Sequence, residues 1–122
     1  MPTRRATTTW SGGLQDGTGQ VELVSSHTAE FEVSFPRRAA DDAQGVTSPE
    51  ELIAAAHSAC FAMQFSALLG QAGGSGIQLS VRAEVALGAD PNGGFRIPSI
   101  TLAVIAPDGI VFAWPRRFVK VH

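Results

Sequence analysis

The stretch TSPEELIAAAHSACFAMQFSALLGQAG, residues Thr47–Gly73, predicts a long helix around which the rest of the chain is organised. Ser48 is a suitable N-cap, Pro49 fits the first helical position, and Glu51 follows the cap by three residues. Together these residues form the pattern of a capping box, with a proline where its missing N–H costs nothing. The sequence therefore predicts a helix that begins at Pro49.

From Leu52 to Leu69 the helix is apolar nearly all round, which is typical of a buried central helix, and Gly70 is expected to end it. The flanking segments mostly alternate polar with apolar residues, as half-buried strands do. We expect strands at Thr3–Trp10, Gln20–Ser25, Glu30–Phe35, Ile77–Leu87 and Phe95–Ile105. Three strands, a long helix and further strands indicate an α+β domain, with the helix packed on an antiparallel sheet.

Turns and loops separate these segments. Pro36–Val46 is a polar, charged loop by composition, and Ala89–Gly94 (ADPNGG) predicts a hairpin with a type I′ turn at Asn-Gly. Pro98 in the returning strand indicates either a sheet edge or a bulge. The last segment of the chain, from Asp108 onward, could form one or two more short strands.

Length and composition limit the classes of function. The chain has 122 residues, enough for one domain, and its net charge of −2 argues against binding nucleic acid. A single cysteine cannot form an internal disulfide, and no apolar stretch near the N-terminus resembles a secretory signal. The window Leu52–Leu69 contains several polar residues, so we expect no membrane span and a cytoplasmic protein.

Cys60, the lone cysteine, lies on the predicted helix and has two interpretations. Free cysteines on apolar helices are commonly small buried hydrophobes. A reactive thiolate here would need a cation from elsewhere, because the helix dipole fades within the first turn. Arg37 or Arg38 could supply it, unless both are ordinary surface arginines. His57, one turn earlier, could act as a base, although packing or hydrogen bonding is the preferred role.

Glu50 is the carboxylate best placed to orient an arginine, since Glu51 belongs to the capping box. Glu50 and Cys60 are ten residues apart, which is about 15 Å along a helix, so one helix cannot bring them together. Two helices packed antiparallel across a twofold axis could do so. The small residues that would permit a close approach are Ala54, Ala55, Ala56 and Ala59. A shared site therefore predicts a homodimer.

The helix motif Thr47–Gly73 resembles the signature helix of the OsmC/Ohr family of organic-hydroperoxide peroxidases, and VELVSS…FEVSFPRR resembles the strands leading to the family's arginine. The resemblance covers roughly residues 6–106. It implies an OsmC-like α+β fold, a swapped homodimer and sites at the subunit interface. By this resemblance Cys60 is the peroxidatic cysteine, Glu50 the glutamate, and Arg38 the arginine, with Arg37 as second choice.

The resemblance implies a thiol-dependent peroxidase of oxidative-stress defence. Arg38, held by Glu50, would stabilise the Cys60 thiolate, which attacks the distal peroxide oxygen, releases an alcohol and becomes a sulfenic acid. The helix residues that would furnish apolar walls for organic hydroperoxides are Phe61, Met63 and Phe65; plain core packing is the alternative for them.

The sequence also departs from the family. We expect a single OsmC-like domain over residues 1–122, in which 107–122 diverge and lack the usual second helix and final strand. Without a second, resolving cysteine, turnover would need an external thiol or lipoyl-type reductant. The alternative is a catalytically impaired fragment that serves as a binding or structural domain. No metal site is expected from His27, His57 and His122, and no cofactor.

Overall fold

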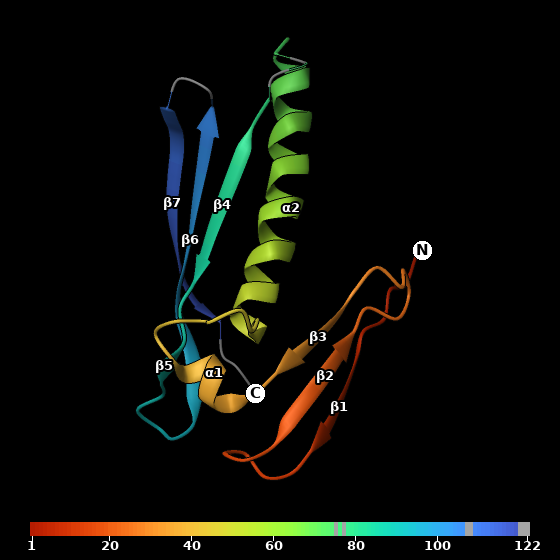
Figure 1. The fold of residues 1–122 in the computed structure, drawn as a ribbon. Helices are drawn as coiled ribbons and strands as arrows, with labels where there is room; N and C mark the ends of the chain where they lie inside the picture. The colour runs from red at the N-terminus through yellow and green to blue at the C-terminus, as the bar shows by residue number, and fades with distance from the viewer. Residues whose placement is uncertain (75, 77, 107–108, 120–122) are drawn as a thin grey trace. The chain divides into compact units, whose positions relative to one another are not determined.

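The computed structural model describes residues 1–74, 76, 78–106 and 109–119, with side chains up to residue 105 apart from those gaps (Figure 1). The chain forms two compact units, Met1–Pro49 and Glu50–His122. Antiparallel sheets and one long helix make up the described residues, which confirms the α+β class.

The N-terminal unit contains a three-stranded antiparallel sheet in the order β1-β2-β3, formed by Thr7–Ser11, Thr18–Glu22 and Glu30–Val33. The three strands predicted ahead of the helix are therefore confirmed, with shifted bounds. Trp10 pairs with Gly19, and Gly19 pairs with Val33, so these residues form one row across the sheet. Directly opposed residues share a face, and this row later forms part of a cavity.

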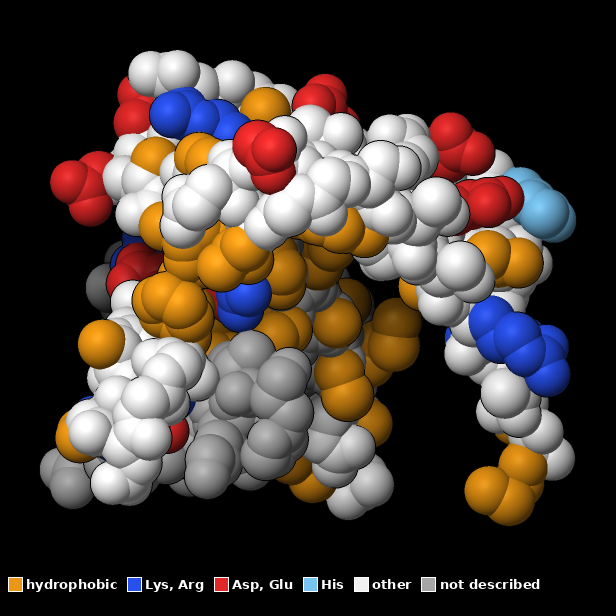
Figure 2. Space-filling model, turned by 90° about the horizontal axis from the view of Figure 1, so that it is seen from below, with side chains coloured by type: hydrophobic (Ala, Val, Ile, Leu, Met, Phe, Trp, Pro, Cys, Tyr) orange, Lys and Arg blue, Asp and Glu red, His pale blue; other side chains and the backbone are white. Residues whose placement is uncertain are grey.

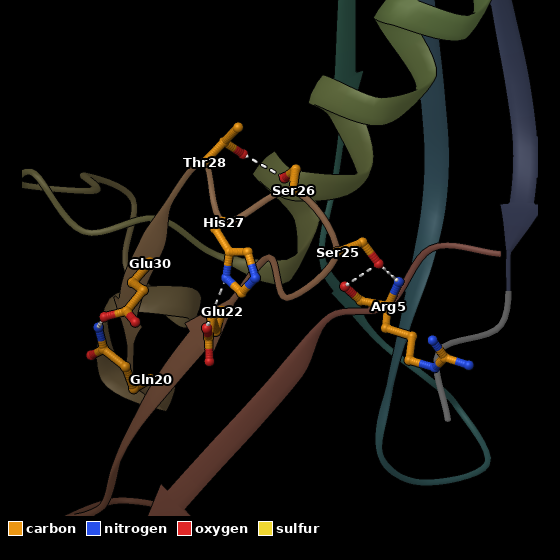
Figure 3. Close-up of polar contacts among 8 residues, drawn as sticks. All are labelled: Arg5, Gln20, Glu22, Ser25, Ser26, His27, Thr28 and Glu30. Atoms are coloured by element: carbon orange, nitrogen blue, oxygen red, sulfur yellow. Dashed lines mark hydrogen bonds and ion pairs between the residues drawn. The ribbon is translucent and has the colours of Figure 1, made fainter. Parts of the chain in front are cut away.

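Hydrogen bonds hold the connection from β2 to β3, and Figure 3 draws those between the residues that it labels. The backbone N–H of Arg5 donates to Oγ of Ser25 at 2.6 Å, tying the segment before β1 to this loop. His27 has a φ of 55°, and its N–H donates to the carbonyl oxygen of Leu23 at 2.9 Å. Its Nδ1 lies 3.9 Å from Oε1 of Glu22. These contacts hold the connection between β2 and β3 in a defined conformation and tie it to the segment before β1.

A short helix, α1 (Phe35–Ala39), follows β3 where the sequence predicts the end of a strand and then a loop. That prediction is wrong for a local reason. Ser34 is an N-cap whose Oγ accepts the N–H of Arg37 at 3.3 Å, and Pro36 stands in the first turn, where proline is tolerated. Arg37 and Arg38 lie in the last turn of α1, so neither is at a strand end.

The long helix α2 spans Pro49–Gln71 and begins at the predicted residue. Its end differs from the prediction, because Gly70 lies inside the helix. Gly73 has a φ of 87°, its N–H donates to the carbonyl of Gly70, and the N–H of Gly74 donates to that of Leu69 at 2.7 Å. These bonds form a Schellman motif with Gly73 at C′. The glycine with a left-handed backbone therefore ends the helix.

Many apolar side chains of α2 are exposed and the others are only half-buried, contrary to the expected burial. Glu50 is the buried residue of α2. Exposed residues recur at spacings of three and four and form what we call the outer seam of α2: Ile53, Ala56, Cys60, Met63 and Ala67. Large hydrophobic side chains are exposed in both units, and Figure 2 shows such side chains open to view.

By length and composition α2 could also cross a membrane, with a mean hydropathy of 1.6 over its most apolar 18-residue window. The expectation that this segment is too polar for a span is therefore wrong on composition. One such helix is weak evidence, because the core helix of a soluble protein has the same length and composition.

The C-terminal unit also contains an antiparallel sheet, centred on the strand β6 (Phe95–Ala106). β4 (Ser80–Val85) and the two-residue β5 (Gly88–Ala89) pair with β6, as does β7 (Gly109–Val119). The opposed pairs Val81–Val104, Ala83–Leu102 and Val85–Ile100 give one apolar face, in which the β6 residues are buried. Figure 1 shows α2 running along the length of this sheet.

The turn between β5 and β6 is not the predicted type I′ turn. Positive φ angles occur at Gly93 and Gly94, not at Asn92. Pro91 fixes a negative φ, and Oδ1 of Asp90 accepts the N–H of Asn92 at 3.0 Å. An Asx turn therefore replaces the expected geometry at Asn-Gly.

Pro98 lies within β6, which has neighbours on both sides, so the edge interpretation is wrong. Its position falls between the residues that pair with β4 and those that pair with β5. A Cβ on Gly88 would lie 3.2 Å from Cγ of Pro98. Pro98 thus marks the interruption that separates β4 from β5.

Candidate functional site

Cys60 is exposed on the outer seam of α2, in its fourth turn. Its neighbours on this face are Ala56, four residues before, and Met63, three residues after, since residues at these spacings share a helix face. Met63 is 73% exposed. Within a single chain, Cys60 is therefore not the buried small hydrophobe of the alternative interpretation, and its sulfur is open to a reagent.

Glu50 lies in the first turn of α2 and is 5% exposed, whereas Glu51 beside it is exposed. A buried carboxylate is costly unless it is paired or hydrogen-bonded. The burial of Glu50 therefore indicates that its carboxylate is paired or hydrogen-bonded. Because α2 is one unbroken helix, Glu50 and Cys60 stay about 15 Å apart along it.

Arg37 and Arg38 are adjacent on α1 but have different surroundings. The Nη1 of Arg37 donates to the backbone carbonyl of Asp42 at 3.4 Å. Arg38 lines a cavity of the N-terminal unit. Arg38 therefore lies at a place where a small molecule could bind, and it remains the better candidate of the two. It belongs to the N-terminal unit, whereas Glu50 and Cys60 belong to the C-terminal one.

The cavity beside Arg38 has a volume of about 210 Å³. Its walls are mostly apolar, with Ser34 and Arg38 as the polar contribution. The lining residues are Trp10, Leu14, Val33, Ser34, Phe35, Arg38 and Pro49. Sequence reasoning did not find this cavity. The available signal was Trp10 on a predicted strand, with Gly17 and Gly19 in the segment that follows it.

Trp10 is held in a defined position by close contacts with glycines. A Cβ on Gly19 would lie 2.7 Å from Cε3 of Trp10, and one on Gly17 would lie 2.8 Å from its Nε1. The indole N–H donates to the carbonyl oxygen of Gly12 at 3.1 Å. The ring therefore covers Gly19 and forms a rigid wall, the arrangement in which an aromatic side chain compensates for a strand glycine.

Phe61 and Phe65, expected as substrate walls together with Met63, lie on another face of α2 than Cys60. Their rings stack with centroids 6.1 Å apart and an interplanar angle of 23°, and both are half-buried. Met63 shares the outer seam with Cys60. Packing is thus the better interpretation of the two phenylalanines, while Met63 remains a candidate wall.

His57 is half-buried, and its Nε2 has no hydrogen-bond partner among the described residues. Among those residues, no group of three or more His, Cys, Asp or Glu side chains could hold a metal ion. His122, the third histidine considered for a metal site, lies outside the described residues.

Comparisons with known proteins agree on one family. The family model for the OsmC-like proteins matches residues 41–112. The chain is 36% identical over 102 residues to proteins named Peroxiredoxin OsmC from Escherichia coli (strain K12) and Shigella flexneri, covering 83% of this chain and 69% of each relative. The matched region includes Glu50 and Cys60. The chain therefore belongs to the OsmC-like family.

Proposed function

We propose that this chain is a thiol-dependent peroxidase that reduces organic hydroperoxides to alcohols through a sulfenic acid on Cys60. The observation that carries the proposal is the position of Cys60, with Glu50 ten residues before it, on the long helix α2 of an OsmC-like chain. The similar proteins are named peroxiredoxins, which supports peroxidase activity at the level of the family. Oxidative-stress defence in the cytoplasm is the role and location that we expect.

The proposed reaction is a two-electron transfer. The Cys60 thiolate attacks the distal oxygen of the hydroperoxide, a sulfur–oxygen bond forms, and the oxygen–oxygen bond breaks. The electron pair leaves with the alkoxide, which takes up a proton and becomes the alcohol. The guanidinium of Arg38 stabilises the thiolate and the charge that develops on the leaving oxygen, and Glu50 orients the guanidinium.

The proposed site is shared by two subunits. Ile53, Ala56, Cys60, Met63 and Ala67 form an uncovered apolar seam of mostly small residues. Such a seam is stabilised when a second helix covers it. An antiparallel pair of α2 helices that crosses near Ile53 and Ala56 would place Glu50 of one chain opposite Cys60 of the other, which removes the separation that one helix imposes. We therefore propose a homodimer, with swapped elements as in the resembled family.

Regeneration of Cys60 requires a reductant from outside these residues, because Cys60 is their single thiol. One external thiol would condense with the sulfenic acid and release water, and a second thiol would reduce the mixed disulfide. A dithiol such as a lipoyl group can perform both steps. The competing proposal is an impaired OsmC-like chain that keeps the fold as a binding or structural domain.

Turnover separates these two proposals. The purified chain is given cumene hydroperoxide and a dithiol reductant, and peroxide consumption is followed beside a Cys60→Ser variant. We expect many equivalents to be consumed by the parent and none above background by Cys60→Ser. If the parent and the variant consume peroxide equally, the peroxidase proposal is wrong and the impaired-domain proposal remains.

A further inference from the structure

We propose that the cavity of the N-terminal unit binds the organic group of the hydroperoxide, so that Trp10 and Leu14 determine which peroxides the protein accepts. This inference rests on the proposed function. It moves substrate selection from α2, where Phe61, Met63 and Phe65 were the expected walls, to the loop and sheet around β1. The cavity contains Arg38, the proposed catalytic arginine, so a substrate bound there would have its peroxide group close to a guanidinium.

The size and chemistry of the cavity indicate the class of organic group. Its volume is about 210 Å³. An apolar protein cavity of about 150 Å³ is large enough for benzene, whereas sites for drug-sized ligands begin near 300 Å³. A single aromatic ring or a compact branched alkyl group therefore fits. The apolar walls favour such a group over water, while Arg38 provides a donor for the polar end of the molecule.

Trp10 supplies a wall that is already formed before a ligand binds. Its ring covers Gly19 and its N–H is bonded to the carbonyl of Gly12, while the side chain remains 41% exposed. A rigid aromatic wall of this kind loses little conformational entropy on binding. An aromatic substituent could stack on the exposed part of the ring in the usual offset geometry, with ring centroids about 4.5–7 Å apart.

Leu14 lies in the loop between β1 and β2 and is 58% exposed. The loop is held by two hydrogen bonds: the N–H of Gly13 donates to Oδ1 of Asp16, and the N–H of Gly17 donates to the carbonyl oxygen of Gly13, both at 2.8 Å. A residue at position 14 can therefore be changed without disturbing a strand. This makes Leu14 suitable for altering the cavity while the fold is kept.

The first test compares Leu14→Trp, which fills the cavity, with Gln15→Trp, which places the same side chain on the next, exposed residue outside the lining. For each variant, the rates of Cys60 oxidation by cumene hydroperoxide and by hydrogen peroxide are measured by quenched-flow mass spectrometry. We expect the ratio of the two rates to fall about tenfold in Leu14→Trp, the usual effect of a lost apolar subsite. Gln15→Trp should keep the parent ratio.

The second test measures binding without chemistry. In a Cys60→Ser, Trp114→Phe chain, Trp10 is the remaining tryptophan, and its fluorescence is followed during titration with 2-phenylpropan-2-ol, the product of cumene hydroperoxide. We expect a saturable change in the fluorescence of Trp10. Leu14→Trp cannot be the blocking variant in this test, because it adds a second tryptophan to the signal. Leu14→Arg is used instead and should abolish the change.

The outcomes are distinguishable. If the parent is oxidised rapidly but Leu14→Trp and Gln15→Trp keep the same rate ratio, substrate selection lies elsewhere and this inference is wrong while the proposed function stands. A Trp10 signal that depends on protein concentration and not on the alcohol would mean that a second copy fills the cavity, which also overturns the inference. If the Cys60 of the parent reacts no faster than free cysteine, the proposed function fails, and the inference fails with it.

Discussion

Trp10 of β1 lies against Gly19 of β2 so closely that a Cβ on Gly19 would stand 2.7 Å from Cε3 of the indole ring. The same Cβ would lie 3.0 Å from Cγ2 of Val33 on β3. Trp10 and Val33 can therefore pack over the centre of this row only because Gly19 has no side chain. It builds one wall of the cavity that contains Arg38, which links strand pairing in the N-terminal unit to the proposed site.

Gly19→Ala is expected to destabilise the protein by about 1–3 kcal/mol, because overpacking forces neighbouring side chains out of their preferred positions. Thr18→Ala is the matched control, since the exposed Thr18 lies beside Gly19 on the same strand. Urea unfolding followed by tryptophan fluorescence gives both free energies of unfolding. Equal stabilities for the two variants would show that Trp10 does not pack against Gly19 in this way.

Gly70→Ala and Gly73→Ala are expected to change the stability of α2 in opposite directions. Gly70 lies within the helix with open space at its Cβ position, so alanine should stabilise by roughly 0.5 kcal/mol. Gly73 has a φ of 87°, where alanine costs about 1 kcal/mol. Thermal unfolding followed by far-ultraviolet circular dichroism measures both. A stabilising Gly73→Ala would contradict the assignment of Gly73 as the helix stop.

Ala56→Glu is expected to dissociate the proposed homodimer, because it places a carboxylate on the outer seam. Burying an unpaired charge costs several kcal/mol, so the dimer dissociation constant should rise by at least about 100-fold. Ala55→Glu is the control, since Ala55 is also exposed but lies outside the seam. Sedimentation equilibrium measures the constants. If both variants stay dimeric, α2 does not pair through the outer seam.

Arg38→Ala is expected to slow the oxidation of Cys60 by cumene hydroperoxide by about 100-fold, a typical effect of removing one donor that stabilises developing charge. Arg37→Ala should change the rate far less, because the Arg37 guanidinium bonds to the carbonyl of Asp42 and is not part of the cavity lining. Rates are compared at one pH by mass spectrometry. The reverse order of effects would assign the role to Arg37.

The sequence predicted the elements that show a regular hydrophobic pattern over many residues or a clear local start signal. The strands and the start of α2 at Pro49 follow from alternation and from the proline at the first helical position. The five-residue α1 was missed, since one Ser-Phe-Pro-Arg turn is too short for a periodic signal. Gly70 was preferred to Gly73 as the helix stop because φ cannot be read from residue type alone.

The candidate site was also predicted only in part. Cys60, Glu50 and the arginine pair were found because they belong to a long helix motif and to the segment that precedes it. The cavity was not found, since its lining combines residues from β1, its following loop, β3, α1 and the start of α2. Pairing register brings Trp10 opposite Gly19, and register depends on contacts between strands that composition does not specify.

The most direct test of the account is the mass of the intact chain after brief exposure to one equivalent of cumene hydroperoxide. We expect rapid, stoichiometric addition of one oxygen atom, which dimedone then traps as a sulfenic acid adduct at Cys60, and no addition in Cys60→Ser. A Cys60 thiol that reacts no faster than free cysteine under the same conditions would contradict the peroxidase assignment.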